Sequence, residues 1–255
     1  MKVIIGIGDS WTQGQGGYPE HIIKEYNGHV ELPIAEDYVL RPYEFKNTWV
    51  TQLCDYYLPD HTPVIQGRRA VGNRAAVRQL YFTDPEIIKN ISSGYLIFLL
   101  SSWDRFDFFK HQRTDDDEFY QFRTMFPGSD HADPLNKVYT VEAAFEINAI
   151  LETMCSIIEA QNFAMVHNLE FIFANSFDPR GIKDFQRFPK LLSQIQIENF
   201  VHNLNNYESF DDMLYKLEKN DMSNYHAPCG HPNIDGYKLI AREFYKFIIE
   251  QNNTK

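Results

Sequence analysis

The chain opens with MKVIIGIGDSWTQGQGG, residues 1 to 17, and this stretch decides the fold. Its apolar run at residues 3–7 is too continuous for a half-exposed strand and predicts a buried parallel strand. The run ends at Gly8-Asp9-Ser10, and a polar, glycine-rich turn follows. Ligands of open α/β sheets bind beyond the carboxyl ends of the strands, so we expect Ser10 at the mouth of a site.

Beyond this stretch, short apolar runs alternate with segments of helical spacing. We expect further strands over residues 63–66, 95–100 and 170–174, and helices over residues 47–57, 73–82, 141–166 and 236–249. The alternation predicts a single domain over residues 1–255, with a three-layer α/β/α architecture and a mainly parallel, flavodoxin-like sheet. An acidic run and two proline-containing turns at about residues 110–138 interrupt the alternation and predict a surface insertion or lid.

Composition excludes several functional classes. The formal net charge of −11 argues against a broad surface for nucleic acid or anionic membranes. No apolar stretch approaches the ~20 residues that a membrane span needs, and no signal-peptide pattern is present. The three cysteines, Cys54, Cys155 and Cys229, are too few and too widely spaced for a disulfide framework. We therefore expect a cytoplasmic protein, free or built into a larger particle.

The triplet at Ser10 has a possible chemical partner near the other end of the sequence. His231 opens the segment His-Pro-Asn before the last predicted helix, and a serine nucleophile needs a base such as histidine. The structural alternatives are that Ser10 only caps a turn and that His231 is a structural histidine. A dinucleotide-binding GxGxxG motif is excluded, because its third glycine would stand at position 11, which holds Trp11.

A metal site is a second alternative in the same region. His226, Cys229 and His231 are zinc-ligand types close together in the sequence. No CxxC or HExxH pattern accompanies them, and no fourth ligand is evident. We therefore predict neither a metal nor a cofactor.

The blocks around Ser10 and His231 resemble those of the SGNH (GDSL-type) esterase and lipase superfamily. The family's GDSxTxG matches residues 8–14, its HPNxxG matches residues 231–236, and Gly72 stands where a middle block supplies a glycine. The resemblance covers nearly the whole chain, block by block and in order. It implies that Ser10 is the nucleophile, that His231 is the general base, and that the backbone N–H groups of Ser10 and Gly72 form an oxyanion hole. The glycines near Ser10 would then leave room for the substrate carbonyl.

The chain departs from the family pattern at two blocks. The family's GxND block reads Ser101-Ser102-Trp103-Asp104 here, so the oxyanion asparagine is replaced by Trp103. Asn73 or Ser102 could supply that donor instead.

The second departure lies before the histidine. The family's aspartate three residues before the histidine is Pro228 here. We expect a backbone carbonyl to orient His231, with Asp221 and Asp235 as the alternative partners.

Three further residues are candidates for substrate binding: Trp11, Trp103 and Arg105. The favoured hypothesis is a serine hydrolase of small esters, with removal of an acetyl group from a saccharide as one form of that activity. Its partner would be a small-molecule or saccharide ester. The alternative is a catalytically degenerate relative kept for binding or for a structural role in an assembly. Arg105 could also pair with a carboxylate of the protein rather than with substrate.

Overall fold

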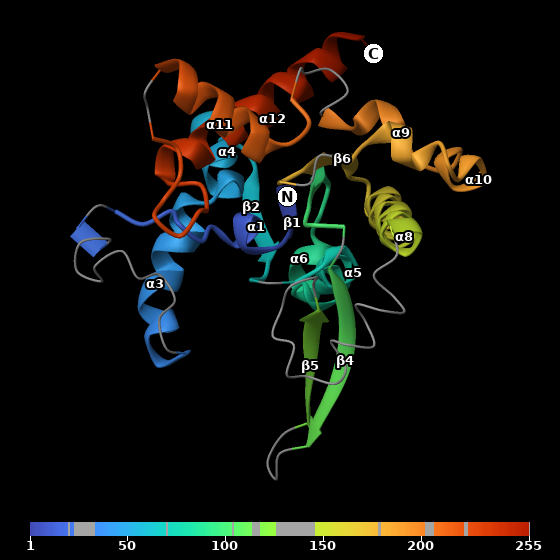
Figure 1. The fold of residues 1–255 in the computed structure, drawn as a ribbon, viewed down its shortest axis with the longest axis horizontal. Helices are drawn as coiled ribbons and strands as arrows, with labels where there is room; N and C mark the ends of the chain where they lie inside the picture. The colour runs from blue at the N-terminus through green and yellow to red at the C-terminus, as the bar shows by residue number, and fades with distance from the viewer. Residues whose placement is uncertain are drawn as a thin grey trace.

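The computed structural model describes residues 1–19, 21–22, 34–69, 71–103, 105–113, 118–125, 146–177, 180–201, 207–221 and 224–254. Four strands form a parallel sheet in the order β2-β1-β3-β6 (Figure 1). Their bounds are β1 Lys2–Gly8, β2 Thr62–Gly67, β3 Ser93–Leu100 and β6 Glu170–Asn175. Each contains the corresponding predicted strand, because a buried parallel strand can be recognised in the sequence as a continuous apolar run.

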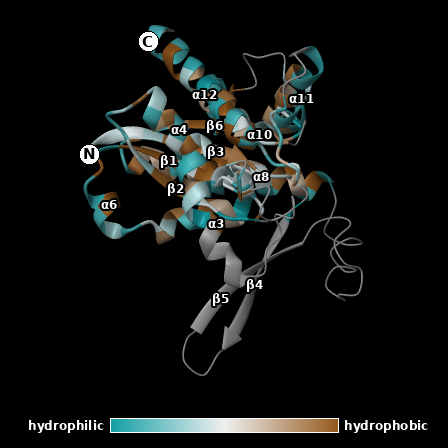
Figure 2. Ribbon diagram, turned by 90° about the vertical axis from the view of Figure 1, so that its left-hand side faces the viewer, coloured by the Kyte–Doolittle hydropathy of each residue, from teal (hydrophilic) through white to brown (hydrophobic). Residues whose placement is uncertain are grey.

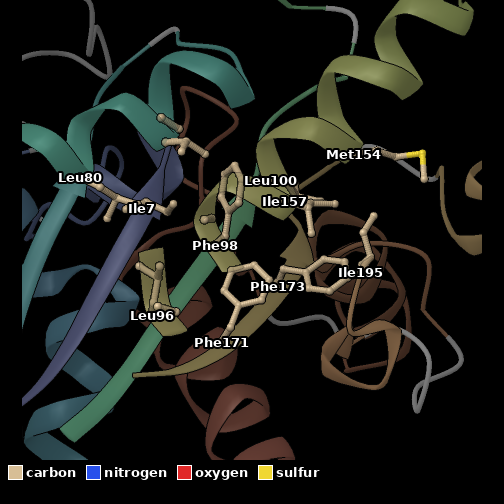
Figure 3. Close-up of a cluster of buried hydrophobic side chains, with 14 of the residues drawn as sticks. Ile7, Leu80, Leu96, Phe98, Leu100, Met154, Ile157, Phe171, Phe173 and Ile195 are labelled. Carbon is tan, nitrogen blue, oxygen red and sulfur yellow. The ribbon is translucent and has the colours of Figure 1, made fainter. Parts of the chain in front are cut away.

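Helices cover both faces of this sheet, which confirms the three-layer α/β/α architecture. One face packs against α5 (Asn73–Arg78) and α8 (Glu146–Val166), and Figure 3 shows side chains of this cluster. The other face packs against α4 (Trp49–Tyr56), α11 (Phe210–Asp221) and α12 (Ile234–Thr254). In Figure 2 the brown, hydrophobic residues concentrate in the strands and in the helices around them.

Alternation along β1 explains how one strand serves both layers. Val3, Ile5 and Ile7 belong to the cluster under α5 and α8, whereas Ile4 belongs to the cluster under α4 and α12. Gly6 shares the face of Ile4, and a Cβ there would run into the side chains of Trp49 and Val50. The missing side chain therefore lets α4 pack directly on the strand.

The remaining elements surround this core. The predicted helix over residues 73–82 is α5 followed by a 3-10 turn, and the predicted helix over residues 141–166 is described from Glu146. Helix α3 (Ile34–Asn47) was not predicted, and it contains Pro42, a residue type that disfavours a helix interior. The short elements are α1 Ser10–Gln13, η1 Gln79–Phe82, α6 Pro85–Lys89, α9 Ile182–Phe185, α10 Pro189–Leu192 and η3 Ile197–Asn199.

A second, separate sheet follows the third strand. β4 (Phe106–Arg113) and β5 (Glu118–Met125) pair as an antiparallel hairpin that extends away from the parallel sheet (Figure 1). The hairpin overlaps the insertion predicted at about residues 110–138; residues 114–117 and 126–138 of that insertion lie outside the described part of the chain. None of the described helices has the length and apolarity that a membrane span requires.

Candidate active site

Ser10 stands where the first strand ends, as its position in the sequence predicts. β1 ends at Gly8, and Asp9 caps α1 by accepting a hydrogen bond from the Trp11 N–H at 3.0 Å. Ser10 is therefore the first residue of a short helix, and 5% of its surface is exposed. Among the described residues its backbone N–H has no acceptor. An oxyanion can therefore use that donor.

A tight turn before α12 fixes His231. The Ala227 N–H donates to the His231 carbonyl at 2.7 Å, and the Asn233 N–H donates to the Tyr225 carbonyl at 2.8 Å. The Asn233 side chain then accepts from two backbone N–H groups in the first turn of the helix. The block His-Pro-Asn thus closes the turn and begins the helix with an asparagine cap.

The structure brings Ser10 and His231 together. The Oγ of Ser10 lies 2.8 Å from Nε2 of His231, although the residues are 221 positions apart in sequence. On the other side of the ring, the Cys229 carbonyl oxygen lies 3.2 Å from Nδ1. A carbonyl can only accept, so Nδ1 carries the proton and Nε2 of the neutral ring is free to accept from the serine hydroxyl.

The Cys229 carbonyl occupies the orienting role that Pro228 cannot fill. Among the described residues no carboxylate accepts a hydrogen bond from His231. Asp235 is exposed and pairs with Lys238 at 3.0 Å, while the side chain of Asp221 is not among those described. A backbone carbonyl, as expected from the sequence, is therefore the partner of Nδ1.

The environment keeps the imidazole neutral. Burial lowers the pKa of His231 from its ordinary value of 6.5, and the nearby Arg105 and Arg69 charges lower it further. The Asp9 carboxylate and the Cys229 carbonyl oppose this shift without reversing it. At neutral pH the ring can therefore accept a proton, which a general base must do.

One glycine of the opening motif, Gly16, lies against the turn that carries His231. Gly16 has a left-handed φ of 96°, and a Cβ there would lie 2.9 Å from the His231 Cβ and 2.6 Å from the Pro232 carbonyl oxygen. The hydroxyl of Tyr237 also donates to the Gln15 carbonyl at 2.7 Å. The absence of a side chain at Gly16 therefore lets the histidine loop approach the serine.

A buried charge network lies beneath Ser10. Asp9 is fully buried and accepts from Ser101 Oγ at 2.9 Å and from Arg105 Nη1 at 3.0 Å. The same Arg105 nitrogen lies 2.9 Å from Ser101 Oγ and 3.2 Å from the Val71 carbonyl oxygen. Arg105 Nη1 is thus held by the protein itself, which is the alternative to substrate binding that the sequence left open.

The candidate oxyanion donors divide into two kinds. Gly72 caps the N-terminus of α5 in an extended conformation, beside the end of the second strand. Asn73 instead holds the core: its Oδ1 accepts from the Ser101 N–H at 2.7 Å and its Nδ2 donates to Thr153 at 3.2 Å. Both ends of the Asn73 side chain amide are therefore bonded within the protein, and the side chain of Ser102 is half-buried.

The two tryptophans proposed for the pocket are part of the core. Trp11 is 3% exposed and contacts Phe177, with ring centroids 6.0 Å apart. Trp103 is 2% exposed and stacks on Phe185 at 5.0 Å with nearly parallel rings. Both side chains are thus packed among buried apolar residues, where a large aromatic surface gains free energy from burial.

One buried cluster at this end was not predicted. Glu44 of α3 is fully buried and accepts hydrogen bonds from Gln13 at 2.8 Å, from the Tyr18 hydroxyl and from Arg69. Burial and the Glu44 charge raise the pKa of Tyr18 far above its ordinary value. Gln13 also accepts from the Arg69 N–H at 2.9 Å, so the cluster ties α1 to the loop after β2. No motif joins these residues, and sequence reasoning had no signal for them.

The proposed metal-ligand types do not gather into a metal site. His226 lies 2.9 Å from Glu218 and 3.2 Å from Asp211, so two carboxylates occupy its ring nitrogens. His231 faces Ser10, and Cys229 contributes its carbonyl oxygen. In the part of the chain that the structure describes, no three His, Cys, Asp or Glu side chains are grouped to hold a metal ion.

Of the comparisons with known proteins, the one with solved structures finds matches. A scan against protein-family models finds no match, and a search of curated proteins finds none. Among solved structures, an acetyl xylan esterase (Est2A) from the rumen bacterium Butyrivibrio proteoclasticus is similar, with 12% identity and a TM-score of 0.49. The match covers 99% of this chain but 64% of that enzyme, so the chain spans less than two thirds of its length.

Two other solved structures match over nearly their whole length. A carbohydrate acetylesterase family member from Sinorhizobium meliloti has 9% identity and a TM-score of 0.43, with 97% of both chains covered. A member of the lipolytic protein G-D-S-L family from Veillonella parvula has 12% identity and a TM-score of 0.42, with 95% of this chain and 96% of that one covered.

Proposed function

We propose that this protein is a serine hydrolase of the SGNH (GDSL) type that cleaves small carboxylic esters. The observation that carries the proposal is the 2.8 Å contact between Ser10 Oγ and His231 Nε2 at the carboxyl edge of the parallel sheet. A neutral imidazole whose Nδ1 is bound to a carbonyl is the form that can take the serine proton.

The reaction proceeds in two steps that both use this pair. His231 takes the hydroxyl proton while Ser10 Oγ attacks the ester carbonyl, and the backbone N–H groups of Ser10 and Gly72 stabilise the oxyanion. The tetrahedral intermediate expels the alcohol, which receives the proton from His231, and leaves an acyl group on Ser10. Water then attacks the acyl-enzyme with His231 again as base, which releases the carboxylic acid and restores the serine.

The surroundings of the serine favour a small acyl group. Ser10 is 5% exposed, and Trp11 beside it is 3% exposed. A cavity of about 840 Å³ opens elsewhere, between η1, α6 and α8, and neither Ser10 nor His231 lines it. We therefore propose an acetyl or similarly short ester, with acetylated saccharides as the first substrates to try.

The test is a panel of short p-nitrophenyl esters and acetylated saccharides, run with the wild-type chain, Ser10→Ala and His231→Ala. Turnover should fall by about 10⁴ or more in both variants, because nucleophile and base act as one unit. Ser193→Ala is the matched control, since Ser193 is a surface serine that bonds only a nearby carbonyl. Equal turnover by wild type and Ser10→Ala would favour the alternative, a degenerate relative kept for binding.

A further inference from the structure

One arginine nitrogen holds together the two backbone segments that carry the proposed oxyanion donors. Arg105 Nη1 lies 3.0 Å from the Asp9 carboxylate and 3.2 Å from the Val71 carbonyl oxygen. Asp9 precedes Ser10, and Val71 precedes Gly72. The side chain of Arg105 is 19% exposed and that of Asp9 is fully buried, so the pair is largely shielded from water.

The contact with Val71 constrains a peptide plane. In a trans peptide the C=O and the following N–H point in opposite directions, and none of the described peptide bonds is cis. A hydrogen bond that fixes the Val71 carbonyl therefore also fixes the direction of the Gly72 N–H.

The contact with Asp9 constrains the other donor. Asp9 uses one carboxylate oxygen to cap the Trp11 N–H at 3.0 Å and the other to accept from Arg105. The cap sets the first turn of α1, in which the Ser10 N–H has no acceptor among the described residues. Arg105 thereby holds Asp9 in the rotamer that orients this turn.

We propose that Arg105 is the positioning residue of the oxyanion hole, an inference that rests on the proposed ester hydrolysis. It sets the distance and direction between the Ser10 and Gly72 N–H groups without touching the substrate. Ser101, which stands at the glycine of the family's GxND block, completes the arrangement, because its Oγ bonds both Asp9 and Arg105. In this chain Arg105 and Ser101 thus position two backbone donors, whereas the resemblance implies an asparagine side chain that itself contacts the substrate.

The experiment compares Arg105→Met, Arg105→Lys and the double variant Asp9→Asn/Arg105→Met on p-nitrophenyl acetate. Each rate is divided by the fraction of sites that a fluorophosphonate titrates, so that misfolded protein does not count. Arg187→Met is the matched control, because it removes an arginine whose ion pair with Glu146 at 2.9 Å belongs to neither strand end nor site.

The expected result separates positioning from folding. In Arg105→Met, kcat per titrated site falls by about 10², the cost of a small misplacement of catalytic groups, while KM changes by less than about threefold. Arg105→Lys, which keeps a charged nitrogen with three donors, recovers kcat to within about tenfold of wild type. The double variant leaves no buried carboxylate unpaired, so it folds and still shows the low kcat.

Two results have different meanings. If wild-type turnover depends on Ser10 but Arg105→Met and the double variant both keep the wild-type kcat per titrated site, Arg105 is structural and the inference is overturned. If the wild-type chain shows no turnover that depends on Ser10, the proposed function itself fails. A boronic acid that forms a tetrahedral adduct should lose affinity in Arg105→Met by the same factor as kcat/KM.

Discussion

The imidazole of His231 makes two hydrogen bonds with different consequences. The bond to the Cys229 carbonyl places the proton on Nδ1, and this tautomer leaves Nε2 free to accept a hydrogen bond from Ser10. Both residues of the pair could be predicted, because each lies in a short block whose spacing is local in sequence. Arg105 was harder to interpret, because its partners Asp9 and Val71 meet it only in three dimensions.

The pH dependence of turnover should report the environment of His231. Burial lowers the pKa of this ring below 6.5, and a general base is active only when it is deprotonated. We expect kcat/KM for p-nitrophenyl acetate to fall as the pH drops through a midpoint below 6.5, and to be level from there to about pH 8. A midpoint clearly above 6.5 would mean that a carboxylate, rather than the Cys229 carbonyl, is bound to Nδ1.

At the scale of elements, loops decide the geometry of the site. The four strands could be predicted from their apolar runs, whereas the hairpin of β4 and β5 could not, because its residues lack a continuous apolar stretch. The turn after Ser10 and the turn before α12 pack on each other through Gly16. Each turn could be predicted from its own sequence motif, but the contact between the two turns could not.

Replacing Gly16 should separate these two turns. In Gly16→Ala the φ of 96° costs about 1–2 kcal/mol, and the new Cβ pushes His231 away from Ser10. We expect lower stability in urea and a fall in kcat larger than the loss of folded protein explains. Gly181→Ala is the matched control, since a Cβ there meets only Phe200 at 3.9 Å, and it should leave kcat per folded molecule unchanged.

His226 joins the histidine turn to helix α11. Burial lowers the pKa of His226, but the hydrogen bonds to Asp211 and Glu218 outweigh it, so the net pKa is raised above 6.5. Its stabilising contribution is therefore complete below pH 6.5 and is lost as the pH rises through the raised value.

The corresponding variant is His226→Gln. The difference in the free energy of unfolding between wild type and variant should be about 1–3 kcal/mol near pH 6, because bonds to a charged group are lost, and should shrink at high pH. Urea unfolding at a series of pH values measures it. A difference that grows with pH would contradict the interpretation that protonated His226 is stabilised by Asp211 and Glu218.

The parallel sheet is the centre of the fold, and an apolar cluster packs on each of its two faces. The fold class could be predicted, because alternating strands and helices leave few other arrangements. The burial of Trp11 and Trp103 could not, because an aromatic residue near a strand end can line a pocket or fill the core, and only packing decides.

The cluster in Figure 3 should carry much of the stability. Phe173 is fully buried in β6 and stacks on Phe171 and Phe200, at 5.6 Å and 4.9 Å between ring centroids. Phe173→Ala should therefore cost about 3–5 kcal/mol in urea unfolding. Phe82→Ala, at a residue 70% exposed, is the control and should cost little. Equal losses would mean that Phe173 is not packed as described.

The central claim is that Ser10 is a nucleophile activated by His231. The most direct measurement is reaction with a fluorophosphonate, followed by intact mass and peptide mapping of wild type, Ser10→Ala and His231→Ala. The account predicts one adduct per wild-type chain, located on Ser10, no adduct in Ser10→Ala, and labelling slowed by about 10³ or more in His231→Ala. A wild-type chain that stays unlabelled at Ser10, or one that labels as fast without His231, would contradict it.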